Sequence, residues 1–240
     1  YAELGGSSPI LKLTKEQSSA LEIKLNQTQK KDEYKCFIIM GCWNPRAKDV
    51  IKDIQSYSPD EIVLMPLYPQ YSAATSGSSI KEWKDVCKTN NYHIKTSTIC
   101  CYPTDQNFIN AHTKEIIKKI KDLKNFKLIF SAHGLPEKNI KKGDPYQWQV
   151  EQSVKKIVES LDDKNLDWIL SYQSRVGPLK WIGPSTENTI IENSKIGKHI
   201  VLVPIAFVSE HSETLVELDI EYKEIADANG CKNYTRVPAL

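Results

Sequence analysis

Short apolar runs rich in β-branched residues alternate along the chain with longer segments in which apolar residues recur every three or four positions. The first pattern predicts buried strands, and the second predicts amphipathic helices. We expect strands at 36–40, 62–67, 128–130 and 200–205, with weaker strand signals at 92–99 and 166–172. We expect helices at 14–26, 45–56, 75–89, 104–123, 145–161, 186–193 and 210–229. This alternation favours an α/β fold with parallel sheets flanked by helices on both faces.

Local signals indicate where some helices begin and where the chain divides. Thr14 and Gln17 fit a capping box, and Pro45 and Pro145 suit the first turn of a helix. A polar, lysine-rich stretch at 119–125 separates two segments of similar composition. We therefore expect two α/β domains, at 1–124 and 125–240.

The composition is that of an ordinary globular protein. The 240 residues include 32 Lys+Arg and 30 Asp+Glu, a formal charge of +2, and 40% are hydrophobic. There is no basic stripe of the kind that binds nucleic acid. The longest apolar stretch, 200–208, contains Pro204 and is far shorter than the roughly 20 residues of a membrane span. The six cysteines form no C-x-x-C pair, so we expect reduced thiols and a cytoplasmic location.

In a parallel sheet, ligands bind beyond the carboxyl ends of the strands. His133 follows the expected strand at 128–130 and opens the turn His133-Gly134-Leu135-Pro136. An imidazole presented there is a proton acceptor near neutral pH. The alternative is a strand-end histidine that only hydrogen-bonds to the backbone.

The segment after the strand at 200–205 is dense in carboxylates. Glu213, Glu217 and Glu221 are four residues apart, which stacks them on one helical face at intervals of roughly 6 Å. Such a column near His211 supplies the hard ligands of a divalent-cation path, whereas acids in a first turn also simply complement the helix dipole. His211 and Glu213 are two residues apart, so they face one pocket only if the helix begins late or contains a π-type bulge.

Two further segments carry candidate binding groups. Residues 75–79 place several hydroxyl groups at an expected helix start, where they bind an anion or merely cap the helix. Trp181 lies in a loop of glycine and proline, where its ring either supports a flat apolar ligand or anchors the loop.

Taken together, these segments resemble the ferrochelatases, which insert ferrous iron into a porphyrin. The resemblance runs in order along nearly the whole chain, through the strings at 1–9, 67–72 with 77–79, 130–136, 143–146, 172–178 with 181–184, and 203–222. It implies two similar Rossmann-like, chelatase-type domains with a porphyrin cleft between them.

The resemblance also assigns roles. His133 and Glu213 correspond to the catalytic pair that removes protons from the pyrrole nitrogens or holds the metal. His211, Glu217 and Glu221 correspond to a helix that conducts metal or protons. The positions that correspond to porphyrin-contacting or pocket-lining residues are Tyr68, Ser72, Thr75, Trp181, Tyr1 and Ser8.

The implied substrates are protoporphyrin IX and ferrous iron, with no resident cofactor. No iron–sulfur cluster is expected, because Ala73 stands where some members have a cluster cysteine. The chain resembles a fragment that lacks the family's first strand, its pocket lip and its last helix, and a peripheral membrane contact is left open for the longer protein. Gly41 and Cys42 replace an Arg-Tyr pair that often borders the cleft. The alternatives are a coproporphyrin or cobalt chelatase of the same fold, or a tetrapyrrole-binding fragment without catalytic activity.

Overall fold

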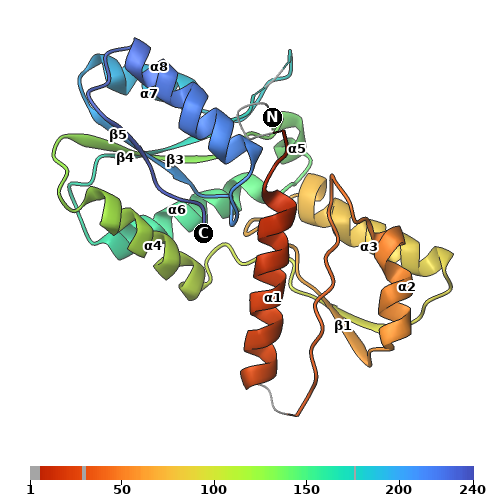
Figure 1. Ribbon diagram of the computed structural model, residues 1–240. Helices are drawn as coiled ribbons and strands as arrows, with labels where there is room; N and C mark the ends of the chain where they lie inside the picture. Colours follow the sequence, from red (N-terminus) through yellow and green to blue (C-terminus); the bar gives the residue numbers. More distant parts are fainter. Residues whose placement is uncertain (1–5, 29–30, 176) are drawn as a thin grey trace. The chain divides into compact units, whose positions relative to one another are not determined.

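The computed structural model describes residues 6–28, 31–175 and 177–240, and it divides the chain into two compact units. The smaller unit comprises Pro9–Leu67 and Tyr71–Cys101, and the larger unit comprises Tyr102–Leu240 with the short segments 6–8 and Tyr68–Gln70 (Figure 1). The expected boundary at 124 and 125 falls inside the larger unit, because helix α4 (Gln106–Ile120) packs against α6 (Tyr146–Leu161) there.

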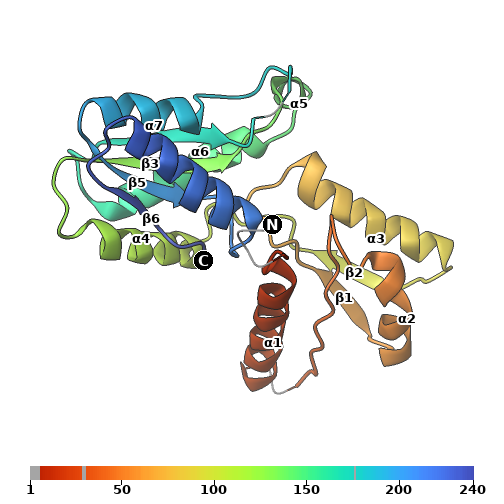
Figure 2. The same cartoon turned by 45° about the horizontal axis from the view of Figure 1, so that its top comes forward.

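The larger unit is built on a parallel sheet with the strand order β4-β3-β5-β6. The strands are β3 (Phe126–His133), β4 (Trp168–Gln173), β5 (His199–Pro204) and β6 (Tyr234–Arg236). All the pairings between neighbours are parallel, so the carboxyl ends of the strands share one edge of the sheet. Figure 2 shows this sheet with helices above and below it.

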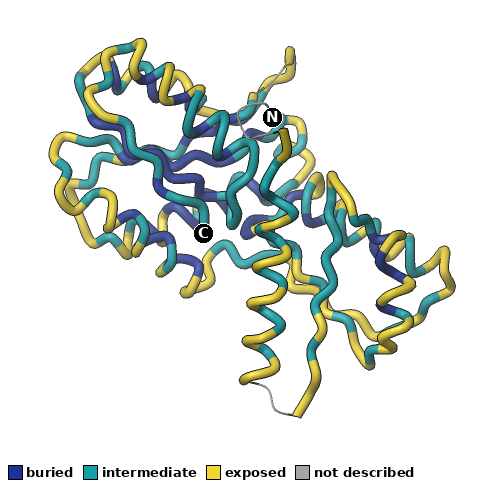
Figure 3. The backbone as a smooth tube through the Cα atoms, viewed as in Figure 1, coloured by how far each residue is buried: buried dark blue, intermediate teal, exposed yellow. Residues whose placement is uncertain are grey.

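Alternating residues of the strands form two separate cores. Leu128, Phe130 and Ala132 pack on the face covered by α4 and α6, together with Val201 and Val203. The residues between them, including Ile129 and Leu202, pack on the opposite face. That face is covered by α7 (Thr186–Lys195), the π-helix η3 (Glu213–Glu221) and α8 (Tyr222–Ala228). Burial on both faces explains why β5 is buried throughout and why β3 is buried from Leu128 to Ala132, as the dark blue centre of this sheet in Figure 3 indicates.

The smaller unit has a two-stranded parallel sheet of β1 (Glu61–Leu64) and β2 (Lys95–Thr98). Its core comes from α2 (Ala47–Tyr57) and α3 (Ser78–Thr89), with Ile62 and Leu64 packed against it. The remaining elements are α1 (Ile10–Thr28) and the short π-helix η2 (Ala73–Gly77) in this unit, and α5 (Glu137–Lys141) in the larger one.

Two sequence-based expectations are wrong in detail. The segment Cys36–Met40 is not a strand, because its terminal amides bond elsewhere: Cys36 N–H donates to the Glu22 carboxylate at 2.7 Å, and Met40 N–H donates to the Pro45 carbonyl at 2.7 Å. Thr14 does not cap α1, because that helix already begins at Ile10 and the Thr14 hydroxyl donates to the Ile10 carbonyl.

Candidate functional site

His133 is the last residue of β3, at the carboxyl edge of the sheet. Its Nδ1 lies 2.7 Å from the Gly134 carbonyl oxygen, so Nδ1 carries the proton and donates it there. The Tyr146 hydroxyl donates to the His133 carbonyl at 3.0 Å, and burial raises the pKa of Tyr146, which keeps the phenol protonated as a donor. These contacts fix the residue from both sides and leave Nε2 with its lone pair.

The carboxylate-rich segment forms a π-helix, as the two-residue spacing of His211 and Glu213 suggested. The helix η3 begins at Glu213, after His211, and the Tyr222 N–H donates to the Glu217 carbonyl five residues earlier. The His211 N–H donates a hydrogen bond to the Thr214 hydroxyl oxygen at 2.9 Å. The late start and the wider turn allow both side chains to face the same site, so the expected departure from an α-helix is confirmed.

Glu213 lies close to both histidines. Its Oε2 is 4.0 Å from His133 Nε2 and 3.9 Å from His211 Nε2. His211 Nδ1 lies 3.2 Å from the Ser209 carbonyl oxygen, and its ring packs against Phe207. Both imidazoles therefore have Nδ1 next to a backbone carbonyl and Nε2 near one carboxylate oxygen, and that oxygen is buried without a hydrogen-bond partner among the described residues.

Glu217 has a different environment from Glu213. Its two oxygens accept hydrogen bonds from Ser174 N–H at 2.8 Å, the Ser174 hydroxyl at 2.5 Å, Gln173 Nε2 at 3.2 Å and the Tyr222 hydroxyl at 2.8 Å. Burial, followed by the charge of Glu217, raises the pKa of Tyr222, so this phenol remains a donor. A carboxylate offers about four acceptor positions. Three of the hydrogen bonds join η3 to the end of β4, and the fourth joins Glu217 to the start of α8.

Glu221, the last residue of η3, is exposed. The column of carboxylates expected from the sequence is thus three side chains in three environments: one between two imidazoles, one fully hydrogen-bonded, and one open to solvent.

Gly134 and Trp181 lie next to His133. A side-chain carbon at Gly134 would be 2.9 Å from the Gln173 carbonyl oxygen and 3.2 Å from the Trp181 ring, so only glycine fits. Residues Pro136 and Trp181 form an isolated bridge, which holds the loop of the tryptophan beside the turn that follows β3. The aromatic ring is therefore a neighbour of the histidine turn, a juxtaposition that the sequence motifs did not reveal.

The other expected binding residues fall in several places. Tyr68 is exposed and belongs to the larger unit, as does Ser8. Ser72 and Thr75 belong to the smaller unit, where the buried Ser72 caps η2 by accepting from Ala74 N–H. Tyr1 lies outside the described residues.

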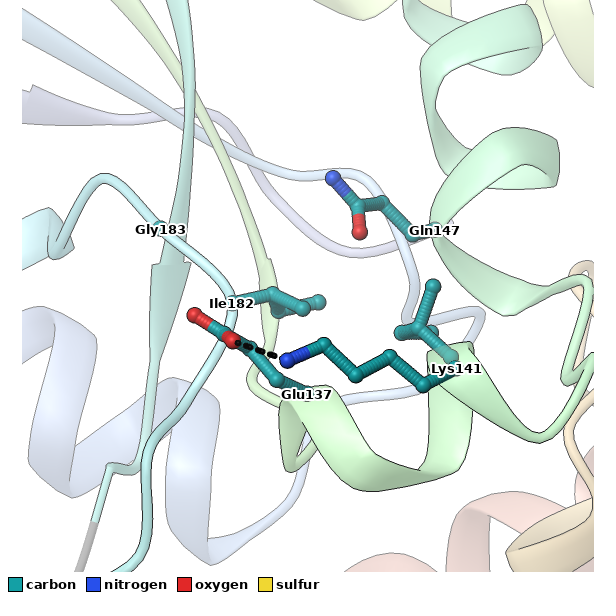
Figure 4. A pocket seen from close by; sticks show the side chains of 6 residues that line it. Glu137, Lys141, Gln147, Ile182 and Gly183 are labelled. Atoms are coloured by element: carbon teal, nitrogen blue, oxygen red, sulfur yellow. Dashed lines mark ion pairs between the residues drawn. The ribbon is translucent and has the colours of Figure 1, made fainter.

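A shallow hollow lies beside α5, and the carboxylate in its wall is paired with lysines. Figure 4 shows the Lys141 ammonium directed at the Glu137 carboxylate, a contact of 3.5 Å, and Lys180 pairs with the same carboxylate at 3.1 Å. Its remaining walls come from Ile140, Gln147, Ile182 and Gly183.

Across the described part of the chain, no three His, Cys, Asp or Glu side chains come close enough together to hold one metal ion. Within the same residues, no helix is both long and apolar enough to cross a membrane.

The arrangement of strands and helices has a known counterpart. SirB from Bacillus subtilis, solved with Fe3+, superposes with a TM-score of 0.64 over 93% of this chain and 81% of that one, at 12% identity. At this identity the likeness concerns the fold, which is the two-unit α/β class.

The family model named Ferrochelatase matches residues 1–240. A ferrochelatase of Pelagibacter ubique (strain HTCC1062) is 88% identical over 240 residues, which are all of this chain and 70% of that protein. A ferrochelatase of Rickettsia felis is 51% identical over 241 residues, 69% of its length. The chain belongs to the ferrochelatase family, and its reaction is that of a lyase in haem biosynthesis.

Proposed function

We propose that the chain inserts ferrous iron into protoporphyrin IX, and that His133, Glu213 and His211 act directly on the reacting atoms. The observation that carries the proposal is the position of Glu213 Oε2, which is 4.0 Å from His133 Nε2 and 3.9 Å from His211 Nε2. The reaction exchanges two pyrrole N–H protons for one Fe2+, so it needs a proton acceptor and a weak metal donor.

His133 Nε2 is the proposed proton acceptor. Its lone pair is available because the Nδ1 proton is engaged by the Gly134 carbonyl. With 44% of the side chain exposed, the imidazole is accessible to a substrate. The imidazolium that forms on proton transfer is stabilised by the Glu213 carboxylate, because opposite charges attract strongly where water is partly excluded.

The proposed metal donors are Glu213 and His211. Oxygen and imidazole ligands suit Fe2+ and release it more readily than thiolates do. We propose that Glu221 is an outer carboxylate along which metal ions or protons reach the site, because it is exposed at the far end of η3. Glu217, with its four hydrogen bonds, is better suited to holding η3 in place than to carrying an ion.

The porphyrin contacts are proposed from the family resemblance at Tyr68, Ser72, Thr75, Trp181, Tyr1 and Ser8. The position of Trp181 next to Gly134 supports its role, since a ring there is close to the proposed base. The cytoplasmic location and the lack of an iron–sulfur cluster remain expectations from the sequence.

The test is an anaerobic insertion assay with Fe2+ or Zn2+, run in parallel on protoporphyrin and coproporphyrin. We expect His133→Ala and Glu213→Gln to lower the insertion rate by about 10²–10⁴-fold, the usual contribution of a positioned acid or base. His93→Ala is the matched control, because His93 is an exposed histidine of the smaller unit whose Nε2 lies 3.1 Å from the Asn91 side-chain oxygen.

Insertion by His133→Ala at the parental rate would contradict the assignment of the base. Porphyrin binding without insertion by the parental chain would favour the tetrapyrrole-binding alternative. A preference for coproporphyrin, or for Co2+ over Fe2+, would identify the sister chelatases.

A further inference from the structure

Cys100 and Cys101 bring two sulfur atoms together outside the proposed active site. They follow β2 by one residue, in the smaller unit, and their Sγ atoms are 3.0 Å apart. Neighbouring side chains of an extended chain point to opposite sides, so adjacency in the sequence does not by itself make sulfurs converge. The contact between the two sulfur atoms therefore depends on the conformation of these two residues in the folded chain.

One backbone hydrogen bond precedes the pair in the smaller unit, and another follows it in the larger unit. Ile99 N–H donates to the Leu64 carbonyl at 2.9 Å, and Tyr102 N–H donates to the Pro69 carbonyl at 2.8 Å. Cys100 is exposed and Cys101 is half-buried, so the pair is accessible from solvent. The two sulfur atoms are 3.0 Å apart before any ligand arrives, which lowers the entropic cost of binding both at once.

The remaining cysteines differ from this pair. Burial raises the pKa of both Cys36 and Cys87, which disfavours their reactive thiolate forms. Cys231 contacts the backbone carbonyls of Lys198 and Asn233 through its sulfur. Cys42 is exposed and is a natural control, since it offers a single sulfur.

The geometry favours a bridging ligand over a disulfide. Adjacent Cα atoms are about 3.8 Å apart across a trans peptide, which is shorter than the roughly 4.4–6.8 Å that disulfides usually span. A ligand bonded to both sulfurs does not require the sulfurs to approach further. If one central atom forms a bond of about 2.3 Å to each sulfur, the sulfur atoms are about 3.3 Å apart when the angle between the two bonds is a right angle. They are about 4.6 Å apart when the two bonds lie in a straight line. The observed 3.0 Å is closest to the angular, pyramidal case.

From these contacts we infer that Cys100 and Cys101 form a dithiol site for a pyramidal, thiophilic trivalent ion, of which trivalent arsenic is the chemical type. With arsenous acid, two As–OH bonds break and two As–S bonds form. Each thiol proton leaves with a hydroxide as water, so the product is one hydroxy-dithioarsenite and two water molecules. No electron is transferred, and no oxidant is needed.

The experiment uses the 240-residue chain and phenylarsine oxide, which reacts with two thiols to release one water molecule. Intact-protein mass spectrometry should detect one phenylarsenic group per chain at micromolar reagent. Cys100→Ser and Cys101→Ser should each weaken this binding by at least 100-fold, whereas Cys42→Ser should leave it unchanged. A dithiol such as dithiothreitol should remove the group, and 2-mercaptoethanol at the same thiol concentration should not.

A second measurement tests whether the folded geometry matters. A ligand that binds the folded chain more tightly than the unfolded chain raises the melting temperature. We expect phenylarsine oxide to raise the melting temperature of the parental chain and of Cys42→Ser, but not that of Cys100→Ser.

An unchanged melting temperature for the labelled parental chain would show that sequence adjacency alone captures the reagent, and it would overturn the proposal. Retained binding in both serine variants would overturn it as well. Neither readout involves porphyrin or iron, so the outcome is independent of the proposed chelatase mechanism.

Discussion

Arg236 joins both ends of the segment that carries His211 and Glu213. From β6, its Nε and Nη2 donate to the Asp219 carboxylate at 2.5 and 2.7 Å, and its Nη1 donates to Glu210 at 2.8 Å. Asp219 lies within η3, and Glu210 directly precedes His211. Only 11% of the Arg236 side chain is exposed. We predict that Arg236→Gln destabilises the larger unit and loosens the proposed site.

The magnitude follows from what the substitution leaves behind. Removing one partner of a buried ion pair typically costs about 3–5 kcal/mol, because an uncompensated charge remains. Here two carboxylates remain, but Asp219 and Glu210 have 34% and 25% of their side chains exposed, so water replaces part of the lost interaction. We therefore expect Arg236→Gln to lower the free energy of unfolding by about 2–4 kcal/mol at neutral pH.

The stability that Arg236 contributes should depend on pH through the ionisation of Glu210. Burial alone would raise the pKa of Glu210, but hydrogen bonds from Thr214 and Arg236 outweigh it and hold this pKa below its usual range. A carboxyl group whose pKa is lowered on folding stabilises the protein above its unfolded pKa and loses this contribution as the pH falls. The stability difference between the parental chain and Arg236→Gln should therefore be complete at pH 7 and shrink below about pH 4.3.

Urea denaturation at pH 7 and pH 3.5 measures this difference. Arg46→Gln is the matched control, because Arg46 is 34% exposed and, within the part of the chain that the structure describes, its guanidinium pairs with one carboxylate, that of Glu82. We expect the control to lose about 1 kcal/mol or less. The reasoning is refuted if Arg236→Gln loses no more stability than Arg46→Gln, or if its loss is equally large at both pH values.

Three other predictions concern His112, Glu217 and Gly134. Burial lowers the pKa of His112 from 6.5 to about 4, so the parental chain should lose up to about 3 kcal/mol as the pH falls from about 6.5 to 4, a loss that His112→Phe removes. Equal acid sensitivity of the two chains in urea denaturation would contradict this. Glu217→Gln should lower the free energy of unfolding by about 2 kcal/mol in the same assay, because the glutamine amide group cannot accept hydrogen bonds from all four donors. Glu221→Gln, at an exposed position, should lower it by under about 0.5 kcal/mol. Equal effects would mean that the four hydrogen bonds contribute nothing. Gly134→Ala should lower the free energy of unfolding by about 1–3 kcal/mol, because the added methyl group contacts the Gln173 carbonyl. Gly183→Ala should have a smaller effect, because a methyl group there would be 3.9 Å from its nearest neighbour, the Ser185 nitrogen. A tolerated alanine at 134 would show that the turn can move.

Much of the secondary structure could be predicted from the pattern of residues. The run at 128–130 lies in β3, the run at 200–205 matches β5 to within one residue at each end, and the periodic segment 145–161 is α6 with one residue added at its start. These elements are strongly periodic and buried, so the local pattern and the tertiary environment agree. The departure from an α-helix followed from a single local conflict, the two-residue spacing of His211 and Glu213, which left a late helix start or a π-type bulge open.

The pattern failed where partners distant in the sequence decide the structure. The apolar residues of Cys36–Met40 gave a strand signal, yet Phe37 and Ile39 pack against helices while the flanking amides bond elsewhere. The strand β6 has three residues, too few for a periodic signal, and it is defined by pairing with β5.

The sequence by itself determined the α/β class, the family motifs and the chemical types of the site residues, because these depend on local periodicity and on residue identity. The tertiary structure decided what each carboxylate does. Glu213 faces two imidazoles, Glu217 binds the end of β4, and Glu210 pairs with Arg236 from a strand that the sequence did not reveal. Hydrogen bonds and ion pairs act over a few ångströms in space, so residues that are identical in the sequence acquire different roles once the parallel strands bring their carboxyl ends to one edge of the sheet.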